Sequence, residues 1–110
     1  GKLDGSAMRV PTPNVSAIYL TFQAARDTTV EELNAAVATA AAGPMSHVLA
    51  YDEEKKVSID FSHTEHSSIF APDQTKVVGG RMVRVLAWYD NEWAFSVRMA
   101  DMAAAMGRLG

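Results

Sequence analysis

Two adjacent glycines, Gly79-Gly80, constrain the fold of this sequence more than any other feature. They separate two short runs rich in β-branched and apolar residues, at positions 75–78 and 82–89. Glycine readily adopts the positive φ angles of a tight hairpin turn, and strands joined by such a turn run antiparallel. The pair therefore predicts a β-hairpin within an antiparallel or mixed sheet.

Further strands are predicted where apolar and polar residues alternate, or where a short apolar run ends at turn residues. They cover residues 15–22, 47–51, 57–61 and 67–71. Both faces of the first strand carry large apolar side chains, which predicts that both faces are covered. The preceding residues 8–14 contain two prolines, so they are expected to form an extended lead-in or an edge strand.

Helical signals occur in two places. Thr29, with Glu32 three positions later, is typical of a capping box, and Gly43-Pro44 stops the apolar pattern, so one helix should span about residues 30–42.

A second helix is expected over residues 93–109, with Asp90 or Asn91 as its N-cap. Its apolar residues surround most of its circumference, which predicts that other structure covers it on several sides. The order of elements predicts an α+β fold: a mostly antiparallel sheet with flanking helices and a long C-terminal helix, in one domain of residues 1–110.

Composition excludes several functions. The 110 residues are 48% apolar and 21% charged, typical of a soluble globular domain, and no membrane association is expected. A net charge of −3 with scattered basic residues does not favour nucleic-acid binding. The sequence has no cysteine, so it can hold neither a thiolate metal site nor a cysteine nucleophile. A reducing, cytoplasmic location is compatible with this composition.

His63 and His66 resemble a fragment of a metal site. Their spacing of three, in a polar loop without an evident third ligand, favours solvated histidines instead, and no metal site is predicted.

Two other segments hold side chains suited to ligands. Arg9 lies in a proline-stiffened segment, where its guanidinium would match phosphate or carboxylate oxygens; an ordinary surface arginine is the alternative. Asn91 lies where a strand is expected to end and a helix to begin. Its side chain either caps that helix or offers a donor and an acceptor to an amide-bearing ligand.

Two runs within these segments resemble signature runs of glyceraldehyde-3-phosphate dehydrogenases. The runs are Ala7-Met8-Arg9-Val10-Pro11-Thr12-Pro13-Asn14-Val15-Ser16 and Trp88-Tyr89-Asp90-Asn91-Glu92-Trp93. Residues 28–32 and 79–83 also resemble that family, in the same order and spacing. The resemblance implies that the chain is the C-terminal part of the catalytic domain, without the Rossmann domain and the catalytic cysteine region.

The resemblance also implies a reaction. The family oxidises an aldehyde phosphate with NAD and inorganic phosphate, in glycolysis or gluconeogenesis, as a cytoplasmic homotetramer. By position, Arg9 would contact the substrate phosphate and Asn91 the nicotinamide carboxamide, with Tyr89 and Phe95 close to the cofactor. Neither a catalytic residue nor a metal ligand would lie in these 110 residues, and alone they would be inactive.

Phe95 stands where the family most often has tyrosine, and Ala94 where glycine is usual. Phe95 and His63 also resemble erythrose-4-phosphate dehydrogenases, which leaves that substrate open as an alternative. A non-catalytic α+β module that acts only in assembly or binding is the alternative of another class.

Overall fold

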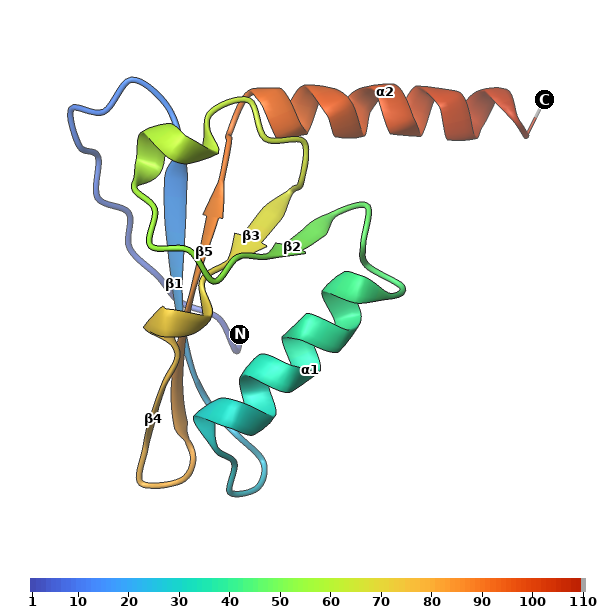
Figure 1. The fold of residues 1–110 in the computed structure, drawn as a ribbon. Coiled ribbons are helices and arrows are strands. Elements are labelled where there is room, and N and C mark those ends of the chain that lie inside the picture. Colours follow the sequence, from blue (N-terminus) through green and yellow to red (C-terminus); the bar gives the residue numbers. More distant parts are fainter. Residues whose placement is uncertain (110) are drawn as a thin grey trace.

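A computed structural model describes residues 1–109 and shows a five-stranded sheet with helices around it (Figure 1). In chain order the elements are β1 (Ser16–Gln23), α1 (Val30–Ala42), β2 (Leu49–Tyr51), η1 (Ser58–Phe61), β3 (Ser68–Phe70), η2 (Pro72–Gln74), β4 (Lys76–Val78), β5 (Met82–Tyr89) and α2 (Trp93–Gly107). The predicted α+β fold, with its mostly antiparallel sheet and long C-terminal helix, is confirmed.

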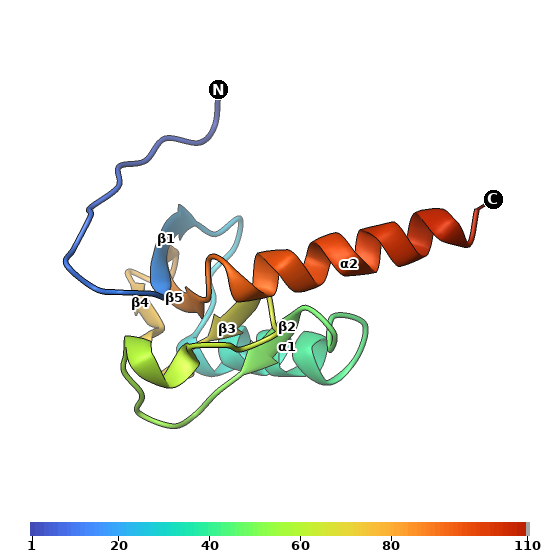
Figure 2. The same ribbon diagram turned by 90° about the horizontal axis from the view of Figure 1, so that it is seen from above.

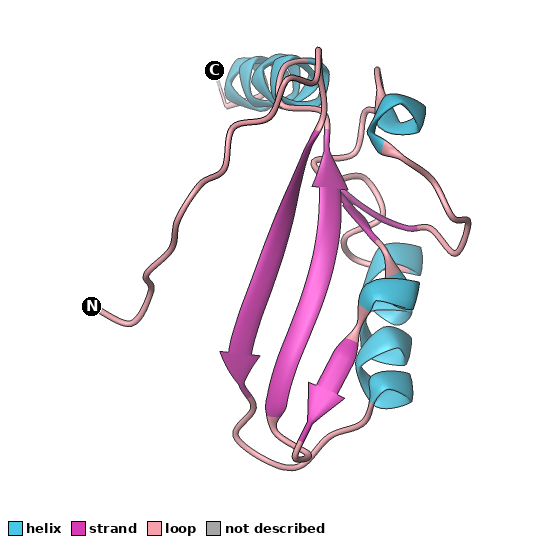
Figure 3. Ribbon diagram, turned by 90° about the vertical axis from the view of Figure 1, so that its left-hand side faces the viewer, coloured by secondary structure: helices cyan, strands magenta, loops and turns pink. Residues whose placement is uncertain are grey.

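Strand β5 organises the sheet. It pairs antiparallel with β1, β3 and β4, and only the β2–β3 pair is parallel. Strands β1 and β5 lie side by side along their whole length (Figure 3), with Ser16 opposite Tyr89 and Gln23 opposite Met82. The register therefore places the residues just before β1 next to the residues that follow β5.

The hairpin between β4 and β5 forms as predicted. Gly79 and Gly80 have φ angles of 59° and 74°, the positive values that a glycine pair tolerates. The Gly80 carbonyl also accepts a hydrogen bond of 2.8 Å from the Thr28 backbone N–H, which ties the turn to the segment before α1.

Helix α1 has the predicted limits. The Thr29 hydroxyl accepts a hydrogen bond of 3.2 Å from the Glu32 backbone N–H, and Gly43 follows the last helical residue. The Glu32 carboxylate contacts Arg26 and Thr28 rather than the Thr29 backbone, so only half of the expected capping box is present.

The strand predicted over residues 57–61 is wrong, because this segment forms the 3-10 turn η1. The Asp60 carboxylate accepts a hydrogen bond of 2.8 Å from the Val57 backbone N–H, a local bond that competes with strand pairing. Phe61 alone is buried, stacked on Trp88 with ring centroids 5.3 Å apart, while Val57 and Ile59 are exposed. The apolar alternation therefore did not mark a buried face.

The predictions that β1 is covered on both faces and α2 on several sides are also wrong for this chain. Every residue of β1 after Ser16 is exposed, because β1 is the edge of the sheet and nothing packs over it. Helix α2 projects beyond the sheet (Figures 1 and 2), and Ala94 is its only buried residue within the described part of the chain. The small core lies instead around Val15, Phe61 and Ile69.

No helix within residues 1–109 combines the length and the apolar character needed to cross a membrane.

Candidate functional site

The candidate site lies where β5 ends and α2 begins. Three residues, Asp90 to Glu92, connect the two elements, and α2 runs across the end of the sheet (Figure 1). The β1–β5 register brings the residues before Ser16 to the same place. Two segments that are far apart in the sequence, one containing Arg9 and the other Asn91, thus converge at one end of the sheet.

Asp90 is the centre of this convergence. Its side chain is only 1% exposed. One carboxylate oxygen, Oδ1, accepts hydrogen bonds from the backbone N–H groups of Glu92 (3.0 Å) and Trp93 (2.8 Å). The other, Oδ2, accepts from the Asn14 side-chain amide and from the His63 backbone N–H, both at 2.8 Å. Asp90 therefore caps the start of α2 and also joins it to two distant segments.

These hydrogen bonds keep the Asp90 carboxylate ionised. Burial by itself would raise the pKa of Asp90, but the N–H groups of Trp93, His63 and Glu92 and the amide of Asn14 outweigh it and lower the pKa to about 2. At neutral pH the site therefore contains one buried negative charge, fully satisfied by donors.

Asn14 and Val15 form the first partner segment of Asp90. The Asn14 amide also donates to the Ser62 hydroxyl at 3.3 Å. Val15 has a φ of 70°, in the left-handed region that β-branched residues rarely adopt, and its side chain is buried in the core. Such a conformation persists only when the surroundings fix it.

His63 forms the second partner segment. It also has a positive φ, of 63°, and its ring lies 4.6 Å from the Trp93 ring, centroid to centroid. Among the described residues, no three metal-ligating side chains are grouped together. The observed partners of His63 are thus the aromatic ring of Trp93 and the carboxylate of Asp90.

The three residues predicted to contact a cofactor all lie at this junction. Tyr89 is half-buried at the last position of β5, and Phe95 is 63% exposed in the first turn of α2. Asn91 is exposed, and its side chain makes no hydrogen bond to any residue in the range 1–109. Asp90 performs the capping, so the interpretation of Asn91 as a cap is wrong and its amide is free for a ligand.

Arg9 is exposed in the lead-in segment before β1. Its guanidinium has no hydrogen bond or ion pair with another described residue, whereas the segment itself is stiff near Pro11, where the Thr12 N–H donates to the Val10 carbonyl at 2.8 Å. The structure joins this segment to the Asn91 junction through Asn14, but it does not bring the Arg9 side chain onto Tyr89, Asn91 or Phe95.

Comparisons with known proteins identify the family. The family described as "Glyceraldehyde 3-phosphate dehydrogenase, C-terminal domain" matches residues 1–91. This chain belongs to that family. It is 65% identical over 109 residues to glyceraldehyde-3-phosphate dehydrogenase of Cereibacter sphaeroides, covering 99% of this chain and 33% of the relative.

Two further relatives give the same result. The glyceraldehyde-3-phosphate dehydrogenases of Xanthobacter flavus and Geobacillus stearothermophilus are 56% and 47% identical over 110 residues, each covering 100% of this chain and 33% of the relative. The chain thus spans about a third of the length of the curated relatives that it matches. The family resemblance inferred from the sequence is confirmed.

Within this glyceraldehyde-3-phosphate dehydrogenase domain, the roles of Asn14 and Ser62 were not evident from the sequence, which indicated Asp90 only as a possible cap. The signal for the cap was local, an aspartate just before a helix. The bonds of Asp90 to Asn14 and His63 depend on the meeting of three segments, which no short pattern reveals.

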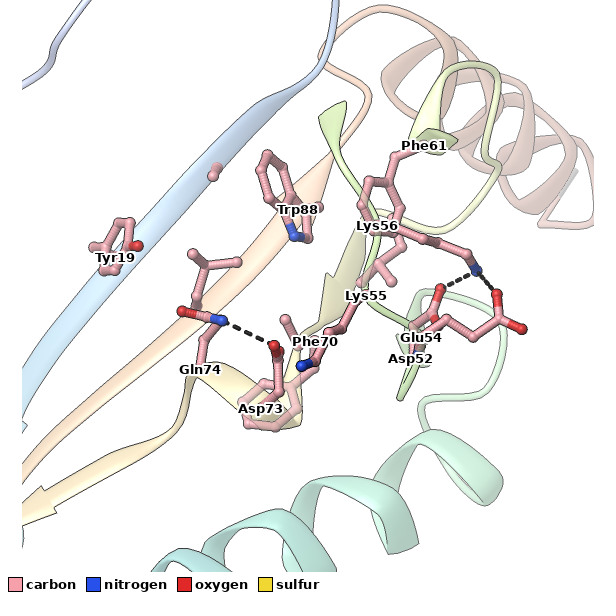
Figure 4. Close-up of a pocket in the computed structure, with 14 residues that line it drawn as sticks. Tyr19, Asp52, Glu54, Lys55, Lys56, Phe61, Phe70, Asp73, Gln74 and Trp88 are labelled. Carbon is pink, nitrogen blue, oxygen red and sulfur yellow. Dashed lines mark hydrogen bonds and ion pairs between the residues drawn. The ribbon is translucent and has the colours of Figure 1, made fainter. Parts of the chain in front are cut away.

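A hollow of this domain lies away from this junction. It has a volume of about 400 Å³ on one face of the sheet, with an apolar floor that includes Phe61, Phe70 and Trp88 and a charged rim (Figure 4). On that rim Lys56 bridges Asp52 and Glu54, at 2.5 and 2.9 Å. None of the four predicted binding residues lines it, so it is separate from the junction.

Proposed function

We propose that this chain is the substrate-phosphate and nicotinamide-contacting part of an NAD-dependent, phosphorylating glyceraldehyde-3-phosphate dehydrogenase. The observation that supports this most is the Asn14–Asp90 hydrogen bond of 2.8 Å. It joins the segment that contains Arg9 to the junction that contains Asn91, in a chain whose whole length resembles that family. Hydride transfer requires the aldehyde carbon of the substrate to lie against the nicotinamide, and a hydrogen bond between the two segments supports the proposal that one holds the substrate phosphate and the other the nicotinamide.

Arg9 suits a phosphate dianion. Its guanidinium is exposed, carries a permanent positive charge and presents planar donors that match phosphate oxygens. Because Arg9 has no carboxylate partner within residues 1–109, a bound phosphate would not have to displace one. Arg9 would bind the phosphate and thereby position the aldehyde carbon at the other end of the substrate.

The residues at the junction fit the nicotinamide end of NAD. The Asn91 side chain has both a donor and an acceptor without protein partners in the described chain, which complements the donor and acceptor of a carboxamide. Phe95 and Tyr89 offer aromatic surface beside it. Hydride acceptance is the chemistry that NAD supplies when bound; Asn91 would orient the ring for it.

The rest of the machinery must come from residues outside this sequence. The family chemistry needs a cysteine nucleophile, and these 110 residues contain none. We therefore propose that the chain acts as part of a longer subunit, that alone it is inactive, and that the parent is a cytoplasmic homotetramer serving glycolysis. The exposed faces of β1 and α2 support the proposal that further structure covers them.

A grafted enzyme tests this function. Residues 1–110 replace the matching third of the Cereibacter sphaeroides enzyme, and light scattering confirms a folded oligomer. We expect NAD-dependent oxidation of glyceraldehyde 3-phosphate that requires inorganic phosphate, and no turnover by the 110-residue chain alone. A folded, oligomeric graft without this activity would show that the proposal is wrong.

Erythrose 4-phosphate is the second candidate substrate, favoured by Phe95, which cannot offer a phenolic hydroxyl to the site. The names of the relatives favour glyceraldehyde 3-phosphate. The ratio of kcat/KM for the two aldehydes in the grafted enzyme decides between them. Equal failure with both, in a well-assembled graft, would instead favour an assembly module without catalysis.

A further inference from the structure

We infer that Asp90 is a positioning residue that holds the Arg9 segment and the Asn91 turn in a fixed relation to each other. The inference rests on the proposed function, because the two segments are assigned there to the phosphate and the nicotinamide. Asp90 itself is buried and would touch neither ligand. It would act through Asn14 on one side and through the start of α2 on the other.

The two oxygens of Asp90 have different tasks. Oδ1 accepts only from Glu92 and Trp93, the two residues that follow Asn91, and so fixes the turn in which Asn91 lies. Oδ2 accepts only from Asn14 and His63, which belong to other segments. A change that alters Oδ2 and spares Oδ1 would therefore separate long-range positioning from helix capping.

Backbone strain supports a special role for Oδ2. Within residues 1–109, the non-glycine residues with positive φ are Val15 and His63. Val15 directly follows Asn14, and His63 is itself the second donor, so each strained residue lies at or next to a partner of Oδ2. Strained positions persist when neighbouring contacts fix them. Oδ2 contacts His63 itself and Asn14, the residue before Val15.

Asp90→Asn makes the required change at nearly constant shape. The amide keeps one oxygen, which can still accept from Glu92 and Trp93 and preserve the cap. Its NH₂ group would replace Oδ2 and face two donors, the Asn14 amide and the His63 N–H. If the amide is reversed, the NH₂ group faces the N–H groups of Glu92 and Trp93 instead. In the first orientation the Asn14 side chain can rotate and accept through its Oδ1, which has no partner among the described residues, so the His63 N–H is the donor that loses its acceptor. In the second orientation the N–H groups of Glu92 and Trp93 lose theirs.

The experiment uses the grafted enzyme with a matched control. Asp101→Asn is the control, because it makes the same chemical change at an exposed carboxylate that pairs only with Arg98 on α2. For Asp90→Asn we expect kcat/KM with glyceraldehyde 3-phosphate to fall roughly ten- to a hundredfold, the range for one or two hydrogen bonds to a charged group. Titration of the active sites should show that the fraction of catalytically competent enzyme is the same in Asp90→Asn as in the wild type.

A second variant distinguishes positioning from general damage. Asn14→Asp combined with Asp90→Asn moves the carboxylate to position 14, where it can accept from the amide at position 90 and from the Ser62 hydroxyl. We expect this exchange to recover part of the lost kcat/KM, although Asn14→Asp alone should be worse, with two carboxylates in contact. Unphosphorylated glyceraldehyde should be affected less than the phosphorylated substrate.

The inference is overturned if Asp90→Asn behaves like Asp101→Asn, or if its loss is equal for both aldehydes and the exchange recovers nothing. Hydrogen exchange of the grafted protein provides a readout that needs no turnover. Peptides around Asn14 and His63 should exchange faster in Asp90→Asn than in Asp101→Asn. If the wild-type graft is inactive, the proposed function fails, whereas unchanged exchange at both places refutes the positioning role of Asp90.

Discussion

Helix α2 exposes an apolar stripe that should make the isolated 110-residue chain associate. Phe95, Met99, Met102 and Met106 follow one another at spacings of four, three and four, so they share one face of the helix. Their side chains are 63, 59, 63 and 65% exposed. The chain as a whole exposes 8105 Å², whereas a folded monomer of 11.9 kDa exposes about 5,900 Å².

The excess, about 2,200 Å², is larger than the roughly 1,600 Å² that a typical specific interface buries. The radius of gyration, 15.6 Å, is also larger than the roughly 13 Å expected of a compact domain of this length. Covering the exposed part of each methionine in the stripe is worth about 1–2 kcal/mol. Removing Met99 and Met102 from both copies of a dimer would therefore cost about 4 kcal/mol or more, close to a thousandfold in Kd.

Sedimentation velocity over a range up to tens of micromolar measures this association, with far-UV circular dichroism to confirm the helices. We expect discrete oligomers for the wild type and monomers for Met99→Glu combined with Met102→Glu. Ala100→Glu with Ala104→Glu adds the same charge to exposed positions on the opposite face of the helix and should leave association intact. A folded wild-type monomer at the highest concentration would refute the reasoning from surface area. Equal association of both double variants would refute the role of the stripe.

The remaining predictions concern the junction, and they use the grafted enzyme. Arg9→Ala should lower kcat/KM for the aldehyde phosphate about ten- to a hundredfold, because one charged hydrogen bond is lost. It should hardly change kcat/KM for unphosphorylated glyceraldehyde, and equal losses for both substrates would make Arg9 a structural residue. Asn91→Asp should leave α2 intact, because Asp90 caps it, but should slow hydride transfer by replacing an amide donor with a negative charge; wild-type turnover and NAD affinity would contradict this. Asp90 has a pKa lowered from 3.8 to about 2, so it stabilises the folded state by about 2 kcal/mol above pH 4 and loses this contribution as the pH falls to 2. Acid unfolding should therefore be less steep in Asp90→Asn than in the wild type, and identical pH slopes would count against the hydrogen-bonded carboxylate.

The parts of the fold that were predicted correctly depend on residues close together in the sequence. The limits of α1 follow from Thr29 at its start and Gly43-Pro44 at its end, all within one turn of the helix ends. The hairpin follows from Gly79-Gly80, whose positive φ angles are a property of the turn alone. Propensity and capping act over three or four residues, so the sequence was sufficient for these elements.

Errors arose where one local interaction opposed another or where tertiary structure decided. Residues 57–61 have the alternation of a strand, but the Asp60 carboxylate bonds to the Val57 N–H and closes a turn instead. The apolar faces of β1 and α2 led to the prediction that both elements are covered, but the described chain contains nothing that covers them. An apolar pattern indicates that a face tends to be buried, and it does not indicate which part of a protein buries it.

Asp90 and Asn91 show why the site could be predicted only in part. They are adjacent in the sequence and differ by one polar atom, but Asp90 is 1% exposed and Asn91 is fully at the surface. The β1–β5 register directs Asp90 toward Asn14 and the core, so both carboxylate oxygens accept hydrogen bonds from protein groups. Asn91, in the turn that this carboxylate fixes, is left with an unused amide. The ligand-binding role proposed for Asn91 thus depends on the aspartate before it, and that division of roles exists only once β1 and β5 have paired.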